Sequence, residues 1–221
     1  MKKILLIFSL ILFTTLSYSQ SFKRVKIDSL VSVSLPATYL TKDTLNQRIF
    51  SANMSYGYAV VIRQANAKNN TPLEREKDLK NVFKDYVKGM SQLAGGIVQN
   101  KRDTTVGTLK GLLFTLRTDD GNGKIQFRRF LLLYTQEATY IFQYFYDDIR
   151  AGFIKDEVKT YYNSIKLSPE LQRNDQYLAT GGGSGLFGIS QMLLYGGATI
   201  IILAVVFTIV IRRKKRDDFI E

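Results

Sequence analysis

The residue types missing from this chain limit the chemistry open to it. Among 221 residues there is no Cys, no His and no Trp. A thiolate nucleophile, a Cys/His zinc site, a His-based triad and a haem ligated by His or Cys are therefore excluded. Only carboxylates, Lys, Ser and Tyr remain for catalysis. A Ser–Lys dyad stays open, although no Ser-x-x-Lys stands in a suggestive context.

Two pairs of adjacent carboxylates are the candidates for acid–base or calcium chemistry. Asp119-Asp120 begins the run Asp-Asp-Gly-Asn-Gly, where Asp is common because it stabilises turns. Asp147-Asp148 precedes a predicted helix, where Asp caps free N–H groups. The first run resembles a calcium loop but lacks the closing Glu. We therefore assign no catalytic, metal or cofactor-binding residue, and we expect no cofactor.

Four lysines recur at helical spacing and form a candidate binding face: Lys77, Lys80, Lys84 and Lys88. Residues three or four apart lie on one side of a helix. One hypothesis is that this face points toward anionic lipid headgroups or an acidic protein partner. A solvated surface that keeps the domain soluble is the alternative. Residues 21–211 contain 24 Lys and Arg against 16 Asp and Glu, so the basic excess belongs to this part of the chain.

The N-terminal segment predicts export. Met1–Lys3 is basic, residues 4–16 are mostly apolar, and Ser17–Ser19 places small residues at alternate positions. This pattern is typical of a secretory signal peptide, so we expect residues 1–19 to be removed. An uncleaved anchor helix is the alternative, but the apolar run is shorter than the ~20 residues that a membrane span needs.

A second apolar segment predicts a membrane anchor. No charged residue occurs from Gln176 to Ile211, and residues 189–211 are long enough to cross a bilayer core of ~30 Å as a helix. Five cations follow and are typical of a stop-transfer signal: Arg212, Arg213, Lys214, Lys215 and Arg216. A buried core helix followed by a nucleic-acid-binding tail is the alternative.

Together the two segments predict a single-pass membrane protein. Residues 20–170 would form one extracytoplasmic domain, periplasmic in a Gram-negative bacterium. Residues 171–188 would be a polar, Gly-rich tether, and residues 212–221 a cytoplasmic basic tail. We expect no nucleic-acid partner, because the domain faces outward and contains no recognised nucleic-acid-binding module.

Alternating apolar residues predict strands through most of the domain. The expected strands cover residues 25–27, 31–35, 48–53, 58–64, 97–106, 112–117, 124–135 and 140–146. Thr41–Asn46 is interpreted as a polar loop. The apolar phase changes around Arg128-Arg129, which predicts a β-bulge there. Tyr140, Phe142, Tyr144 and Tyr146 alternate along the chain, and Ile141 and Phe145 lie between them. Because both faces of this strand therefore carry apolar residues, we expect it to be core.

Two amphipathic helices are predicted among these strands. The first begins with Thr71 as N-cap and Pro72 at the first helical position, and ends at Gly95-Gly96. Its expected buried stripe includes Leu93. The second runs from about Ile149 to Ser164, capped by Asp148, with Ile149, Phe153 and Ile154 facing inward. We therefore predict an α+β fold with a mostly antiparallel sheet flanked by helices.

The order of these motifs resembles the PsbP-like proteins. An opening hairpin ends at Leu35-Pro36, and a long amphipathic helix lies mid-chain. The strand Gly111–Phe114, the aromatic strand Tyr140–Tyr146 and a final helix closing in Ser164–Leu167 follow. Relatives of this family include the Ran-binding Mog proteins and many short exported bacterial proteins. The resemblance implies a PsbP-like sandwich that serves in binding or assembly rather than catalysis. Metal-binding His positions of some plant members have no counterpart, because the chain has no His.

We therefore expect a membrane-anchored extracytoplasmic binding or assembly module that holds a protein partner near the membrane, with no catalytic activity. Two alternatives remain open. One is a small-ligand or lipid-binding domain with a cleft between sheet and helix. The other is an envelope hydrolase or transferase that uses carboxylate or Ser–Lys chemistry.

Overall fold

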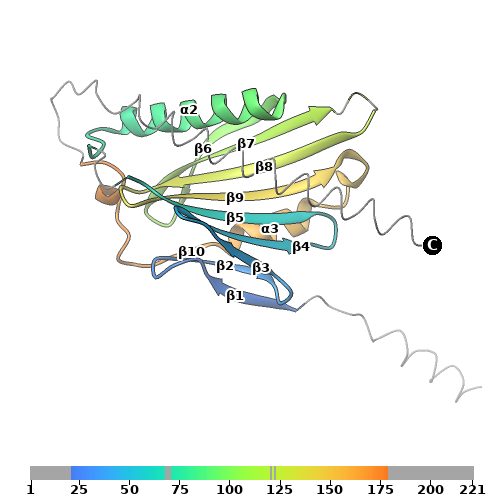
Figure 1. Cartoon of the computed structure of the whole chain (residues 1–221), viewed down its shortest axis with the longest axis horizontal. Helices are drawn as coiled ribbons and strands as arrows, with labels where there is room; N and C mark the ends of the chain where they lie inside the picture. Colours follow the sequence, from blue (N-terminus) through green and yellow to red (C-terminus); the bar gives the residue numbers. More distant parts are fainter. Residues whose placement is uncertain (1–20, 68–70, 120, 122, 179–221) are drawn as a thin grey trace, which may run out of the picture.

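A large antiparallel sheet runs through the middle of the molecule, and a small sheet packs on one of its faces (Figure 1). The computed structural model describes residues 21–67, 71–119, 121 and 123–178. The strand order is β3-β4-β5-β9-β8-β7-β6 in the large sheet and β1-β2-β10 in the small one. The strands are β1 (Phe22–Lys26), β2 (Val31–Pro36), β3 (Leu40–Asp43), β4 (Gln47–Asn53), β5 (Tyr58–Ala65), β6 (Ile97–Val106), β7 (Leu109–Asp119), β8 (Ile125–Tyr134), β9 (Ala138–Asp147) and β10 (Lys166–Leu167).

Two hydrophobic cores lie on opposite faces of the large sheet. The small sheet and helix α3 (Lys155–Asn163) cover one face, and helix α2 (Glu76–Ala94) lies on the other. Strand β9 contributes to both cores: Tyr140 and Tyr144 point to the first, and Ile141 to the second, all 0–1% exposed. The predicted α+β class and the core position of the aromatic strand are therefore confirmed.

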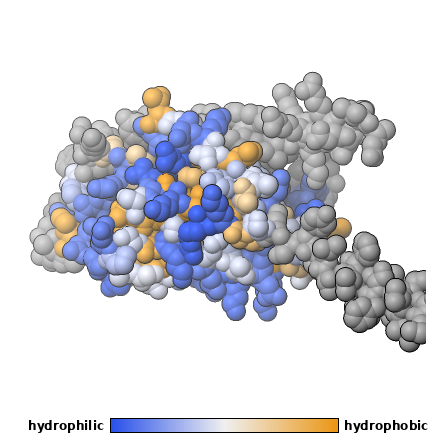
Figure 2. Space-filling model, turned by 90° about the horizontal axis from the view of Figure 1, so that it is seen from below, coloured by the Kyte–Doolittle hydropathy of each residue, from blue (hydrophilic) through white to orange (hydrophobic). Residues whose placement is uncertain are grey.

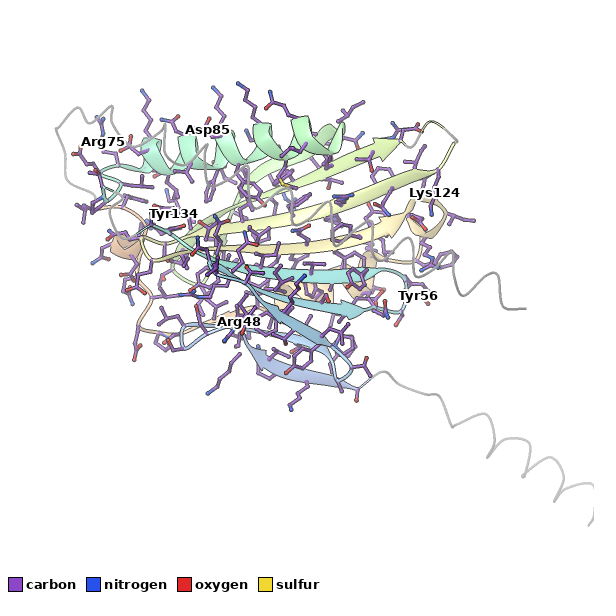
Figure 3. All side chains as sticks on the ribbon, in the orientation of Figure 1. Arg48, Tyr56, Arg75, Asp85, Lys124 and Tyr134 are labelled. Atoms are coloured by element: carbon purple, nitrogen blue, oxygen red, sulfur yellow. The ribbon has the colours of Figure 1, made fainter. Side chains whose placement is uncertain are left out.

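Seen from the side of the small sheet, the surface is mostly hydrophilic, with smaller hydrophobic areas between (Figure 2). Along the long axis, Arg75 and Tyr134 mark one end of the sandwich, and Tyr56 and Lys124 mark the other (Figure 3). We call the first end the Arg75 end. Helix α2 runs from this end toward the other along the strands.

Helix α2 buries Leu79, Phe83, Val87 and Met90, which recur at helical spacing. It ends where expected, because Gly95 adopts the left-handed conformation with φ 59°. The predicted buried stripe is wrong at Leu93, which is 53% exposed. That residue lies in the last turn, at the flank of the stripe.

The predicted start of α2 is also wrong. The helix begins at Glu76 rather than Pro72, and the Asp78 carboxylate accepts a hydrogen bond from the Arg75 N–H at 2.9 Å. A tertiary contact takes the place of the expected N-cap at Thr71. The Leu73 carbonyl accepts a hydrogen bond from the Leu178 N–H at 2.9 Å, so this segment is held by the C-terminal part of the domain.

The predicted bulge at Arg128-Arg129 is absent. Strand β8 pairs in unbroken register with both neighbours, while the register shift falls between Gln99 and Arg102 in β6. Both faces of β8 are covered, so apolar residues of either parity can be accommodated without an extra residue. The change of phase arises because Arg128 lies on the α2 face, with its guanidinium carbon 5.0 Å from the centre of the Phe145 ring.

Two further segments differ from the expected structure. The predicted polar loop overlaps β3, an exposed edge strand paired with β4. The predicted last helix is interrupted: a 3-10 turn, η1 (Asp148–Arg150), precedes α3. Ile149 and Phe153 consequently lie outside the helix, 85% and 67% exposed, whereas Ile154 is buried as expected.

The folded domain extends to Leu178, beyond the expected boundary at residue 170. We call residues 168–178 the C-terminal strap; it includes the 3-10 turn η2 (Arg173–Asp175). Leu171, Gln176 and Tyr177 of the strap are buried. Gln176 lies where β7 and β8 separate. Its amide accepts from the Lys110 N–H at 2.7 Å and donates to the Lys110 and Tyr134 carbonyls at 2.7 and 2.9 Å. It therefore satisfies backbone groups at the end of the β7–β8 ladder.

A polar contact joins the small sheet to the large one. The Asp28 carboxylate accepts hydrogen bonds from the Leu30 and Val31 N–H groups, each at 2.9 Å. Its other oxygen accepts from Arg63 Nε at 2.6 Å and from the Tyr140 hydroxyl at 2.7 Å. One side chain thus shapes the β1–β2 turn and fixes it against β5 and β9.

Candidate binding groove between α2 and β6

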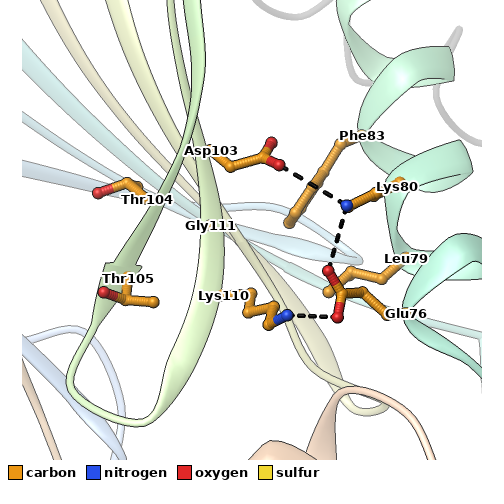
Figure 4. Close-up of a pocket in the computed structure, with 9 residues that line it drawn as sticks. All are labelled: Glu76, Leu79, Lys80, Phe83, Asp103, Thr104, Thr105, Lys110 and Gly111. Carbon is orange, nitrogen blue, oxygen red and sulfur yellow. Dashed lines mark hydrogen bonds and ion pairs between the residues drawn. The ribbon is translucent and has the colours of Figure 1, made fainter.

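A groove of about 400 Å³ lies between α2 and the edge of the large sheet (Figure 4). Leu79 and Phe83 of α2 form its buried apolar part, 1% and 5% exposed. Strand β6 contributes Asp103, Thr104 and Thr105, and β7 contributes Lys110 and the backbone of Gly111. Polar side chains therefore surround a small apolar floor.

Four charged side chains connect α2 to β6 and β7 across the groove (Figure 4). The Glu76 carboxylate accepts a hydrogen bond from Lys110 Nζ and forms an ion pair with Lys80 Nζ at 3.2 Å. These two lysines lower the pKa of Glu76. Lys80 also lies 3.9 Å from Asp103, whose side chain is 70% exposed. The network orients Lys80 toward β6.

Among the four lysines selected from the sequence, Lys80 is the one that lines the groove. Lys77, Lys84 and Lys88 are exposed on the same helix. At 100° per residue, Lys80 and Lys84 lie on the flank of α2 that faces β6, and Lys77 and Lys88 lie next to them toward solvent. The role of these lysines toward a lipid or a partner remains a prediction.

The sequence did not indicate Glu76, Asp103, Thr105 or Lys110 as site residues. They come from three elements, and only the pairing of β6 with β7 and the position of α2 bring them together. One signal was available: residues 97–106 lack a clean apolar alternation, which is typical of a strand at the edge of a sheet.

Of the paired carboxylates, Asp119, Asp147 and Asp148 lie within the described residues. The Asp119 carboxylate accepts a hydrogen bond from the Gly121 N–H at 3.0 Å, an ordinary turn contact. Asp147 ends β9 and Asp148 begins η1. Within the described ranges, no group of three or more Asp or Glu side chains is arranged to hold a metal ion.

Two polar side chains on the α2 face of the sheet, half-buried Arg128 and fully buried Gln143, were also missed. Burial lowers the pKa of Arg128 to about 10. Gln143, 0% exposed, has no hydrogen-bond partner for its side-chain amide among the described residues. It pairs across the sheet with Val60 and Phe130, which are both apolar.

Comparison with known proteins gives matches in fold only. No protein-family model matches the chain, and no curated protein is similar to it at a significant level. The solution structure of cyanobacterial PsbP from Synechocystis sp. PCC 6803 is similar with a TM-score of 0.47 and 12% identity, covering 69% of this chain and 95% of that one. A crystal structure from Bacteroides thetaiotaomicron VPI-5482 is similar with a TM-score of 0.40 and 12% identity, covering 63% of this chain and 46% of that one.

The Synechocystis structure is of a PsbP protein, the family that the sequence resembles. With 12% identity and a TM-score of 0.47, the similarity transfers no functional residue to this chain.

Several predictions concern segments outside the described residues. These are the signal peptide 1–19, the tether beyond Leu178, the span 189–211 and the tail with Arg212–Arg216. Within the described residues, no helix combines the length and apolar character that a membrane crossing requires.

Proposed function

We propose that this chain is a single-pass, membrane-anchored extracytoplasmic module that binds a protein partner close to the bilayer. The observation that supports the proposal most directly is the course of the C-terminal strap. The strap ends at Leu178, whose N–H donates a hydrogen bond to the carbonyl of Leu73. Because Leu73 lies just before α2, Leu178 is placed at the Arg75 end of the domain.

The distance to the predicted span is short. Between Leu178 and Ile189 lie only the ten residues 179–188. A fully extended segment of this length reaches at most ~35 Å, and a flexible one averages ~20 Å. The groove and the lysines at the start of α2 would therefore stay near the membrane surface.

Such tethering favours weak binding to other membrane proteins. Two proteins confined to one bilayer meet at a higher effective concentration than two proteins free in solution, as two modules joined by a short linker do. A module with a modest groove and a basic helix can then hold a partner without a large interface. This matches the binding or assembly role that the sequence resemblance implied.

Topology is tested first, using the absence of native Cys. Single Cys residues are introduced at Lys159, exposed on α3, and at Asp218 in the predicted tail, in cells of a bacterial host. A membrane-impermeant maleimide should label Lys159→Cys in spheroplasts and Asp218→Cys only after lysis. Labelling of both sites in intact spheroplasts would contradict the proposed topology.

Partner binding is tested by site-specific photo-crosslinking in the same membranes. A photoreactive residue at Lys84 should give an adduct of discrete mass, and one at Lys159 on the opposite face should not. Removal of residues 179–221 should greatly reduce the adduct. If no discrete adduct forms at any exposed α2 position, the proposed function is wrong.

A further inference from the structure

The outer edge of β6 is open for part of its length. Strand β6 ends the order of the large sheet, and no other described strand lies beyond it. Its first part is irregular: the register shifts between Gln99 and Arg102, and Asn100 has φ 52°. A bulge and charged residues usually protect an edge from pairing with another chain. From Arg102 to Val106 the strand is regular.

The pairing of β6 with β7 predicts which backbone groups face outward. Gly107 and Thr108 form a two-residue turn between Val106 and Leu109, with Gly107 at φ 55°. The residues that flank such a turn bond to each other, and bonded and non-bonded pairs alternate from there. The N–H and C=O groups of Asp103 and Thr105 therefore point away from β7, toward the open edge.

The groove lies beside this open stretch. Asp103 and Thr105 both line it, and both are exposed. A strand added to β6 would lie about 5 Å farther out. Alternate side chains of that strand would point to the α2 side, toward the apolar surface of Leu79 and Phe83.

The positive charge of helix α2 beside β6 favours a particular kind of sequence in the added strand. Lys80 and Lys84 lie on the β6 flank of α2, and Lys77 and Lys88 lie next to them. Glu76 and Asp103 are engaged by lysines within the groove. An incoming segment therefore meets mainly cations above the edge, which favours an acidic sequence.

From this arrangement we infer that β6 binds an extended, acidic segment of a protein partner by strand addition, with one apolar side chain of the segment entering the groove against Leu79 and Phe83. The inference rests on the proposed function, because it specifies how the partner is held. Backbone bonds at Asp103 and Thr105 would supply affinity, and the groove and the lysines would supply sequence preference.

The test uses random linear peptides displayed on phage and panned against the full chain in nanodiscs, after counter-selection on empty nanodiscs. Enriched peptides should carry acidic residues around an apolar one. Binding should weaken at least tenfold in Thr105→Pro, which removes an outward N–H, and much less in Thr105→Val, which keeps that N–H and changes only a side chain of the groove. Lys80→Glu with Lys84→Glu should weaken binding, and the difference from wild type should shrink at high salt.

Amide exchange provides a second measurement that needs no variant, in case Thr105→Pro fails to fold. The enriched peptide should slow exchange at Asp103 and Thr105, which face outward, more than at Thr104, which already pairs with β7. Three results would each overturn strand addition. The peptides could bind Thr105→Pro and Thr105→Val equally well, no peptide could be enriched over empty nanodiscs, or the amides of Asp103 and Thr105 could gain no protection.

A second copy of this chain is the competing occupant. If the mass of the wild-type protein in solution is that of a dimer, and if Thr105→Pro returns it to that of a monomer, then β6 pairs with a second copy of this chain. That result would overturn the inference that β6 binds a segment of a partner protein. The in-cell crosslinks separate this inference from the proposed function. A partner that crosslinks to the domain, together with a failed peptide test, would leave the proposed function standing.

Discussion

Asp28 shows how much one side chain can contribute to this fold. Its carboxylate accepts four hydrogen bonds from three segments, and its side chain is only 17% exposed. Asp28→Asn removes the negative charge opposite Arg63. It also replaces one accepting oxygen by an NH2 group, which then faces two hydrogen-bond donors. We expect a loss of about 2–3 kcal/mol in the free energy of unfolding, measured with urea. The matched control is Asp43→Asn, which breaks an exposed pair with Arg48 and should cost no more than about 0.5 kcal/mol.

The same carboxylate predicts a pH dependence. Burial alone would raise the pKa of Asp28, but hydrogen bonds from Tyr140, Arg63 and two backbone N–H groups outweigh it, so the pKa is lowered. The stability that the ionised Asp28 carboxylate contributes is complete above the pKa of Asp in the unfolded chain, about 3.9. It is lost as the pH falls through the lower pKa that Asp28 has in the folded protein. The difference in stability between wild type and Asp28→Asn should therefore narrow below about pH 4. If the difference in stability between the two proteins is the same at every pH, the lowered pKa of Asp28 is contradicted.

Gln143 predicts the opposite effect of substitution. A buried amide without a partner costs free energy, and an apolar side chain of similar shape avoids that cost. Gln143→Met should therefore raise the free energy of unfolding by about 1 kcal/mol, and the melting temperature by about 2–4 °C. Thermal unfolding followed by circular dichroism measures the shift. A lower melting temperature would mean that the amide is satisfied in the folded protein.

At the scale of elements, the sequence predicted structure best where one local pattern decided the outcome. The strands 48–53, 58–64 and 97–106 and the Gly95 end of α2 agree with the structure. Errors arose where tertiary contacts competed with local signals. Leu73 bonds to Leu178 instead of continuing a helix from Pro72, and the two covered faces of β8 made a bulge unnecessary. The groove could be predicted only through Lys80, because its other charged residues come together through the pairing of β6 with β7 and the position of α2.

The C-terminal strap carries a prediction of its own. Gln176→Ala would leave the Lys110 N–H and the Lys110 and Tyr134 carbonyls without their partner at the end of a buried ladder. We expect a loss of about 2–3 kcal/mol in the free energy of unfolding. Gln172→Ala is the control: Gln172 is exposed, so its loss should stay within about 0.5 kcal/mol. Equal effects of the two changes would show that the strap is not anchored through Gln176.

At the scale of the whole molecule, the domain boundary follows from the burial of the strap. A chain of residues 21–178 should unfold in a single cooperative transition. A chain of residues 21–170 lacks Leu171 and Tyr177, which belong to opposite cores, and should melt at a clearly lower temperature or fail to fold. Differential scanning calorimetry compares the two. Equal melting temperatures of the two chains would show that residues 171–178 add no stability, and the domain boundary would then lie at residue 170 as the sequence predicted.

Strand β2 has a consequence for the order in which the molecule forms. It lies between β1, the first strand of the domain, and β10, the last, and pairs with both. A chain made from the N-terminus onward can form the β1–β2 hairpin early, but Val31 must wait for Leu167 before the small sheet is complete. Such distant pairings form slowly. The final assembly of the sandwich therefore coincides with the arrival of β10 and the C-terminal strap, so that a chain cut short upstream of β10 leaves an unpaired strand edge and an incomplete core.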